Sequence, residues 1–339
     1  MRRVAPLALP ILIVVVVLLA HRWWWSGAAD ALVVYCAHDS IFSRSIIDDF
    51  EAQSGLEVDL RLDNEATKSL ALTERLIAER DRPVCDVLWN NQWLGTADLA
   101  ERGVLAPYRG PGYERIPARF RDAEGRFAGF AARFRVYIVN TGQMPADAAS
   151  VETALKGDLS RLAVARPLWG TTLSHYAVLW AQYGGDWVRT WRDDWQRRGV
   201  VERGSNGTVK SLVADGTCRL GLTDTDDFFV ALDAGAPVDM VPVRIEERYV
   251  CIPNTVAIVA GTRRLDRAQR FVDYLLSEHV EMLLARGPAR QVPLGPVDDA
   301  ALPDQVRRMR SWVDFAHDLR PMTAARGEAL AWLKAELLR

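Results

Sequence analysis

Cysteine is scarce in this chain, and the usual catalytic motifs are missing. Only four cysteines occur among 339 residues, and no two of them form a C-x-x-C pair, which argues against a structural zinc site or a thioredoxin-like redox site. The sequence also contains no G-x-S-x-G, no H-E-x-x-H and no glycine-rich phosphate loop, which are motifs of hydrolases, metalloproteases and nucleotide-binding enzymes. We therefore expect a protein that catalyses no reaction and carries no cofactor.

The four cysteines leave two structural possibilities open. They are widely spaced along the chain, at Cys36, Cys85, Cys218 and Cys251. Four cysteines allow three pairings, and the sequence does not choose among them. Either buried, unpaired thiols or one structural disulfide would account for these residues.

Lysine is rare in this chain, and the net charge is small. The chain has only four lysines, so arginine supplies most of its 42 basic residues, and 44 acidic residues bring the formal net charge to −2. Such a balance offers no long-range attraction to nucleic acid. Because arginine is common throughout, we do not interpret scattered arginines as phosphate-binding sites. At this length, the chain suits two domains of ordinary size.

The one long apolar run stands at the N-terminus. It extends from Ala5 to Ala20, after Arg2 and Arg3, and is followed by tryptophans at positions 23–25. A basic start, a short apolar stretch and the small-residue string Ala29-Asp30-Ala31 are typical of a cleavable export signal. Because tryptophan favours the membrane interface, an uncleaved anchor stays open. We predict that residues 1–31 direct the protein to the periplasm or another extracytoplasmic space.

Short apolar runs and amphipathic segments alternate through the rest of the chain. Buried parallel strands read as such runs, and helices between them bury one face. The pattern predicts strands over residues 32–36, 56–62, 85–89, 134–140, 162–165, 200–202, 219–222 and 255–259, with helices in between and a helical C-terminal part. This order predicts two α/β sets built on parallel sheets.

Eight segments carry a family resemblance. They are VVYCAHD (33–39), EATK (65–68), CDVLWNN (85–91), GVLAPY (103–108), GLTDTDD (221–227), IPNTVA (252–257), FVDYLLS (271–277) and RQVPL (290–294). In this order and spacing, the chain from about Leu32 to Leu294 resembles the periplasmic ferric-iron-binding and related solute-binding proteins of ABC importers.

The resemblance implies an α/β, two-lobed type II periplasmic-binding-protein fold with two hinge crossovers. We expect a signal peptide or membrane anchor over residues 1–31 and the first part of lobe I over 32–137. Lobe II would span residues 138–253, and residues 254–339 would complete lobe I and add C-terminal helices. The hinges would lie near residues 133–140 and 245–255. Expected partners are the importer's permease subunits and one small ligand, which a monomer would carry.

The ligand would lie between the lobes, where open α/β sheets place their sites beyond the carboxyl ends of the strands. Polar residues follow the predicted strands at these ends, and two arginines stand at the crossover. The candidates are His38, Asp39, Glu65, Thr67, Asn90, Asn91, Arg133, Arg135, Thr171, Thr172, Asn206, Asp224, Asp226 and Asp227.

Four of the candidates, His38, Glu65, Asp226 and Asp227, could hold a metal ion, because carboxylates suit hard cations. Ferric iron would then be transported cargo. The ferric-binding relatives, however, carry two adjacent tyrosines where Asp226 and Asp227 stand here. The same carboxylates could hold an organic amine such as a polyamine or cap helices, while helix starts at Thr171 and Thr208 would suit a phosphonate or similar anion. A membrane-anchored sensory module that reuses the clamp is a further alternative.

Overall fold

The computed structural model describes residues 30–63, 70–168 and 170–338. Most of the predicted export signal, together with Glu65 and Thr67, lies outside these residues. Within them, no helix is both long and apolar enough to cross a membrane.

The structure has two α/β halves, and each is built around parallel strands. In the first, β1 (Leu32–Cys36) lies between β2 (Val58–Leu62) and β3 (Val87–Asn90). In the second, β6 (Leu162–Ala165) lies between β7 (Val201–Arg203) and β8 (Leu220–Asp224). The predicted pair of α/β sets is therefore present.

Two long strands join the halves. β5 (Ala128–Asn140) pairs with β12 (Cys251–Val259) through Phe134, and from Arg135 onward with β8 and β9 (Val238–Pro242). β12 continues the sheet to β3 and β4 (Leu105–Ala106). The Arg135 N–H donates to the Val250 carbonyl, and the Arg135 carbonyl accepts from the Val243 N–H. Both crossings of the chain thus meet at Arg135.

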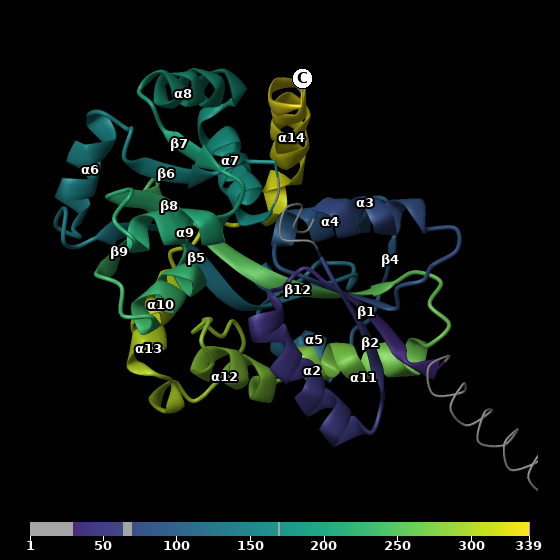
Figure 1. The fold of residues 1–339 in the computed structure, drawn as a ribbon. Coiled ribbons are helices and arrows are strands. Elements are labelled where there is room, and N and C mark those ends of the chain that lie inside the picture. Colours follow the sequence, from purple (N-terminus) through teal and green to yellow (C-terminus); the bar gives the residue numbers. More distant parts are fainter. Residues whose placement is uncertain (1–29, 64–69, 169, 339) are drawn as a thin grey trace, which may run out of the picture.

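Helices flank the sheet of the first half (Figure 1). α2 (Ser40–Ser54) buries Phe42, Ile46 and Phe50, and it ends at Gly55, whose φ of 69° is readily adopted by glycine. The remaining helices of this half are α3 (Leu70–Ala78), α4 (Trp93–Glu101), α5 (Pro111–Arg115), α11 (Leu265–Leu275) and α12 (Glu278–Arg286).

The second half has its own helices and ends in a short hairpin. Its helices are α6 (Ala148–Lys156), α7 (Gly170–Tyr183), α8 (Gly185–Arg197), α9 (Asn206–Ala214) and α10 (Thr225–Asp233). The hairpin of β10 (Arg244–Ile245) and β11 (Arg248–Tyr249) then leads into β12.

The C-terminal part is helical, as predicted, and contacts both halves. After α13 (Asp304–Arg310), α14 (Thr323–Leu337) packs against α7 and α4 (Figure 1). Trp180 on α7 donates its indole N–H to Glu328, at 2.9 Å. On the other side, Lys334 forms an ion pair of 3.3 Å with Glu74 on α3.

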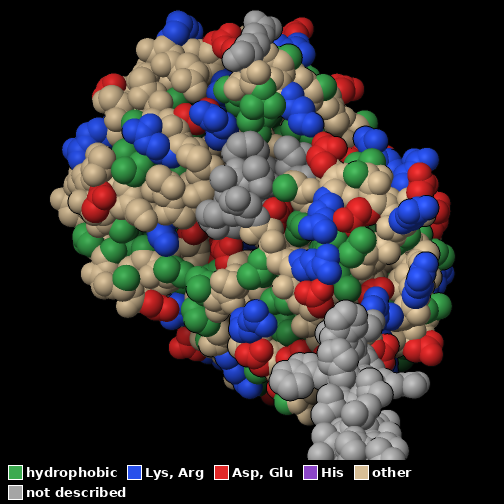
Figure 2. All heavy atoms as spheres, turned by 45° about the vertical axis from the view of Figure 1, so that its right-hand side comes forward, with side chains coloured by type: hydrophobic (Ala, Val, Ile, Leu, Met, Phe, Trp, Pro, Cys, Tyr) green, Lys and Arg blue, Asp and Glu red, His purple; other side chains and the backbone are tan. Residues whose placement is uncertain are grey.

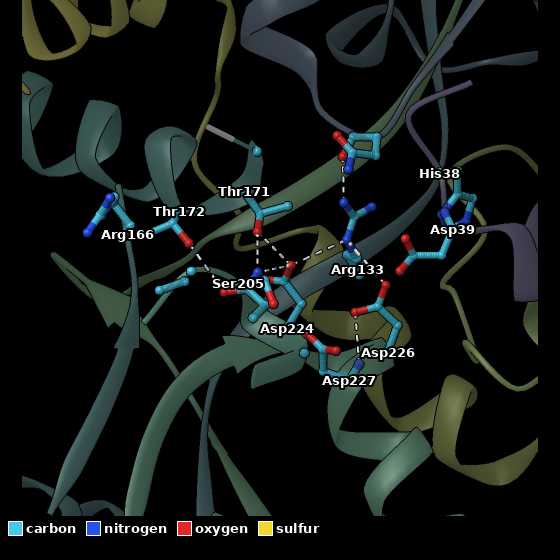
Figure 3. A pocket seen from close by; sticks show the side chains of 16 residues that line it. His38, Asp39, Arg133, Arg166, Thr171, Thr172, Ser205, Asp224, Asp226 and Asp227 are labelled. Carbon is cyan, nitrogen blue, oxygen red and sulfur yellow. Dashed lines mark hydrogen bonds and ion pairs between the residues drawn. The ribbon is translucent and has the colours of Figure 1, made fainter. Parts of the chain in front are cut away.

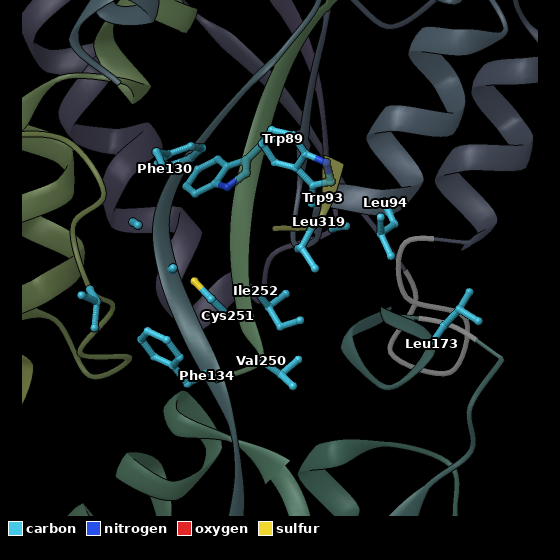
Figure 4. Close-up of a cluster of buried hydrophobic side chains, with 14 of the residues drawn as sticks. Trp89, Trp93, Leu94, Phe130, Phe134, Leu173, Val250, Cys251, Ile252 and Leu319 are labelled. Atoms are coloured by element: carbon cyan, nitrogen blue, oxygen red, sulfur yellow. The ribbon is translucent and has the colours of Figure 1, made fainter. Parts of the chain in front are cut away.

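Large apolar side chains fill the region around the crossing strands. Trp89 and Phe130 pack with ring centroids 5.9 Å apart, and Phe134 is fully buried below them (Figure 4). All four cysteines are free and buried, so the unpaired-thiol possibility holds and the disulfide does not. On the face shown in Figure 2, acidic and basic side chains are interspersed.

Candidate functional site

A cavity of about 60 Å³ lies where strand ends of the two halves meet (Figure 3). Ten of the fourteen predicted residues line it: His38, Asp39, Asn91, Arg133, Thr171, Thr172, Asn206, Asp224, Asp226 and Asp227. Their contact with a solute stays a prediction. We call this space the solute cavity.

Asp224 holds the local structure together. It ends β8 and precedes α10, and its carboxylate accepts from Arg135 Nη1 and Thr171 Oγ1, both at 2.6 Å, and from Asn206 Nδ2 at 3.1 Å. Burial opposes ionisation, but the guanidiniums of Arg135 and Arg133 outweigh it and lower the pKa of Asp224. Asp224 therefore ties the starts of α7 and α9 to the crossing strand.

Asp226 and Asp227 lie in the first turn of α10, where a helix dipole favours acidic residues. Asp226 accepts the N–H of Asp227 at 3.0 Å, and Asp227 accepts the Thr223 hydroxyl at 2.7 Å. Burial, with added repulsion from neighbouring carboxylates, raises the pKa of Asp226 to about 8 and that of Asp227 to about 6. A cation beside them would favour the charged forms.

Arg133 reaches both halves of the molecule. Its Nη2 donates to the Asn91 carbonyl at 2.6 Å, while its Nε lies 3.5 Å from Asp224 and 3.4 Å from Asp226. Asn91 is 6% exposed, and its side-chain Oδ1 is buried without a hydrogen-bond partner in the structure. This oxygen is an acceptor that a ligand N–H could satisfy.

His38 and Asp39 approach from the first half. The His38 ring packs against Phe42 and Trp89, and its Nε2 lies 3.0 Å from Gln291 Nε2. Asp39 directs its carboxylate toward Arg133 and Asp226 (Figure 3). Asp39 thus brings a carboxylate of the first half opposite Asp226, while the predicted Glu65 lies outside the described residues.

Hydrogen-bond donors line the other end of the solute cavity. Arg166, Thr172, Ser205 and Gly207 line it there, beside the first turns of α7 and α9. Ser205 caps α9 by accepting the Thr208 N–H at 3.2 Å. Arg166 directly follows β6 but was not among the predicted residues, because arginine is too common in this chain for one position to stand out.

Two of the predicted residues lie behind the solute cavity. Asn90 donates its side-chain amide to the Thr96 hydroxyl at 3.0 Å and accepts the Asn91 N–H. Arg135 is fully buried and bound to Asp224. Both positions support neighbouring residues from within the core.

Asp224, Asp226 and Asp227 form the one group of potential metal ligands in the described part of the chain, with ligand atoms within 4.8 Å of one another. His38 is not part of this group. The Asp224 carboxylate is already occupied by Arg135 and Thr171, and the permanently charged Arg133 lies within 3.5 Å of two of the three aspartates. The donor set therefore fits a metal ion only in part.

Residues 32–286 match the family described as bacterial extracellular solute-binding protein. An uncharacterized protein of Haemophilus influenzae is 24% identical over 290 residues, which span 79% of this chain and 80% of that one.

Solved structures share the fold. Iron-bound HitA from Pseudomonas aeruginosa has a TM-score of 0.73 at 19% identity, covering 90% of this chain and 98% of HitA. AfuA from Actinobacillus pleuropneumoniae, with fructose-6-phosphate bound, has a TM-score of 0.74 at 18% identity, covering 91% and 98%. The architecture is thus the two-lobed periplasmic-binding-protein fold.

Proposed function

This chain belongs to the bacterial extracellular solute-binding proteins, and we propose that it serves an ABC importer as the substrate-binding component. Lobe I would comprise residues 32–137 and 254–339, and lobe II residues 138–253. A solute that contacts both lobes stabilises the closed form by the difference between its closed-state and open-state affinities. The closed protein then docks on the permease. We propose no chemical step.

The family indicates an extracytoplasmic location. We propose that residues 1–31 export the protein, by a segment that is either cleaved or kept as an anchor. The sensory alternative would keep the anchor and use closure as a signal.

For the solute, we propose a small zwitterion with a protonated amine and an acidic group, such as an aminoalkyl phosphonate. The acidic end supports the amine: four aspartates line the solute cavity against two arginines. Burial of Asp226 and Asp227 disfavours their charged forms, which a cation would stabilise. The unpartnered Asn91 Oδ1 adds a neutral acceptor for the same amine. This last observation carries the proposal, because an amine N–H can bond to this oxygen without displacing any existing contact of the aspartates.

The other end supports the acidic group. Arg166 lines the solute cavity there with Thr172 and Ser205. The first turns of α7 and α9 lie beside them and present backbone N–H groups and positive dipole ends. A phosphonate accepts hydrogen bonds from both kinds of donor. In the present state the solute cavity holds only a few non-hydrogen atoms, so a larger solute requires the lobes to move apart.

A metal ion is the second candidate, favoured by the three neighbouring carboxylates. The similar structures carry different cargo, iron in HitA and a sugar phosphate in AfuA, so the fold leaves both classes open. The existing contacts of Asp224 favour the amine over the ion. Arg135 and Thr171 already occupy this carboxylate, which a metal ion would need as a ligand. An amine needs only the acceptors left on the other two aspartates and on Asn91.

A thermal-shift screen of protein purified from the periplasm separates the candidates. We expect 2-aminoethylphosphonate to stabilise the protein, by about 2.7 kcal/mol at a hundred times its Kd. Ethylamine and ethylphosphonate each keep one half of the zwitterion and should give smaller shifts. Replacing Asp226 and Asp227 with Asn should remove most of the affinity while keeping the fold.

Two outcomes would contradict the zwitterion. A shift with ferric citrate or Ca²⁺ alone, lost in the double Asn variant, would favour the metal candidate. Unchanged affinity in that variant would leave the aspartates as residues that stabilise the start of α10 and move the site to Thr172, Ser205 and Arg166.

A further inference from the structure

A second cavity, of about 440 Å³, lies on the opposite face of the crossing strands. Arg133 of β5 points into the solute cavity and pairs with Ile252 of β12. Cys251 and Pro253, the neighbours of Ile252, line the second cavity. Because successive strand residues point to opposite faces, the two cavities lie on the two sides of this ribbon. We call the second one the rear cavity.

The floor of the rear cavity is apolar and buried. Trp93, Phe120, Leu319 and Met322 are each less than 8% exposed, and Figure 4 shows Trp93 and Leu319 close to β12. Gln182 at the end of α7 and the β10–β11 hairpin complete the walls. Elements of both halves therefore surround one space.

Two arginines of the rear cavity lack an acidic partner. Arg320 binds Asp318, and Glu246 accepts a hydrogen bond from Tyr183. Arg119 donates to the Val313 carbonyl and stacks over Phe120, with its guanidinium carbon 4.6 Å from the ring centroid. Among the described residues, Arg119 and Arg248 form no ion pair, although Arg119 adds to Arg320 in lowering the pKa of Asp318. Three arginines face Glu246 and Asp318 in the rear cavity, which leaves one positive charge in excess above an apolar floor.

We propose that the rear cavity binds an organic anion with an apolar body, an alkyl or aryl carboxylate or sulfonate. Its volume falls within the range of small-molecule sites, about 300–1,000 Å³. An inorganic anion would leave the apolar floor uncovered, and a neutral hydrocarbon would leave the two guanidiniums unpaired. This ligand would be distinct from the transported solute, which lies beyond β5 and β12.

The probe for the test is 8-anilinonaphthalene-1-sulfonate, an aryl sulfonate that fluoresces in apolar sites. The intact protein should bind it saturably at one site. 4-Phenylbutyrate should displace it, and the uncharged 4-phenylbutan-1-ol should compete at least tenfold more weakly.

Variants locate the binding. Arg248→Gln should weaken probe binding about tenfold, because it removes one of the two unpaired guanidiniums of the rear cavity. Arg248 is exposed, and its side chain makes no hydrogen bond or ion pair with the described residues, so the fold should persist. Arg244→Gln, on the same hairpin but bound to Glu247 and outside the cavity, should bind as wild type does. Asp226→Asn changes the solute cavity and should also leave probe affinity unchanged. Equal affinity of wild type and Arg248→Gln, equal competition by the acid and the alcohol, or loss of binding in Asp226→Asn would each overturn the proposal.

Discussion

Asp224 and Asp226 lie two residues apart, yet their surroundings move their pKa values in opposite directions. Both are buried, which disfavours the charged form. The Asp224 carboxylate lies 2.6 Å from Arg135 Nη1, whereas the Asp226 carboxylate lies 3.4 Å from Arg133 Nε. The pKa of Asp224 therefore falls and that of Asp226 rises. One carboxylate has a structural partner, and the other is left for a ligand.

The raised pKa values predict how the stability of the solute-free protein depends on pH. A carboxyl group whose pKa is higher folded than unfolded stabilises the fold at low pH, and this contribution is lost as pH rises through the folded value. For Asp226, with a pKa of about 8 against an ordinary 3.8, the loss runs from about pH 4 to pH 8. In urea unfolding, the free energy of unfolding of Asp226→Asn should rise relative to that of wild type by on the order of 2 kcal/mol between pH 5 and pH 8. A constant difference would show that Asp226 ionises freely.

Asp224→Asn should destabilise the protein strongly. It leaves the fully buried Arg135 guanidinium without its carboxylate, and breaking a buried pair costs about 3–5 kcal/mol. The matched control is Asp233→Asn, which breaks the more exposed pair with Arg290 and should cost less than about 1 kcal/mol. Equal midpoints of the two variants in chemical unfolding would remove the structural role of Asp224.

The sequence predicted which residues meet in the solute cavity but not the contacts among them. Ten polar residues predicted at strand ends and at the crossover line this cavity, because strand ends of parallel sheets converge. That a solute binds there stays a prediction. The sequence could not predict that Thr171 and Asn206 donate hydrogen bonds to Asp224, because those contacts join α7, α9 and β8, which are distant in the chain. For Arg166 the strand-end position was a usable signal that the abundance of arginine obscured.

Among the elements, α12 fixes the first half to the crossing strand through one side chain. Glu281 is fully buried and accepts from Arg115 at 2.6 Å, from the Ala131 N–H at 2.9 Å and from the Leu294 N–H at 2.7 Å. Ala131 lies at the irregularity of β5 and has a φ of 39°. The carboxylate thus secures the backbone where β5 departs from regular pairing.

Glu281→Gln should cost about 3 kcal/mol or more. Its amide would turn an N–H₂ group toward Arg115 or a backbone donor, which leaves buried donors unsatisfied. The control, Glu278→Gln in the exposed first turn of the same helix, should cost no more than about 1 kcal/mol. Thermal unfolding of both variants provides the measurement, and similar losses would contradict this role.

At the level of elements, the strand bounds were predicted correctly where a run of apolar side chains alone specifies the strand. The strands at 32–36 and 162–165 were predicted residue for residue, because buried apolar runs specify them. β5 begins at Ala128 rather than Phe134, because small residues such as Gly129 carry no strand pattern and pairing with β12 extends the strand. The two-residue strands β10 and β11 are too short for any periodicity.

For the whole molecule, the continuous sheet and α14 predict joint unfolding of the two lobes. β5 and β12 belong to both halves, and α14 packs against α7 and α4. Scanning calorimetry of the solute-free protein should show one transition whose calorimetric and van't Hoff enthalpies agree. Two separated transitions would contradict this coupling.

Trp332→Ala tests the contribution of α14. Trp332 lies 5.7 Å from the Trp180 ring and 5.9 Å from the Arg189 guanidinium, so its loss should cost about 2–3 kcal/mol and lower Tm. Trp187→Ala removes a tryptophan that is 43% exposed and should lower Tm by less than half as much. Equal shifts would mean that α14 adds little to the joint stability.

The four buried thiols have a consequence for chemical labelling. All are free, and burial raises the pKa of Cys36 and Cys251 to about 12, so alkylating reagents meet almost no thiolate while the chain stays folded. Cys251 differs in position, since it lies at the floor of the rear cavity and on the strand that joins the lobes. Cys251 should react when the lobes separate at the rear cavity, whereas Cys36 in the first strand should react only when the chain unfolds. The ratio of the two alkylation rates would therefore distinguish these two openings without any added dye or engineered cysteine.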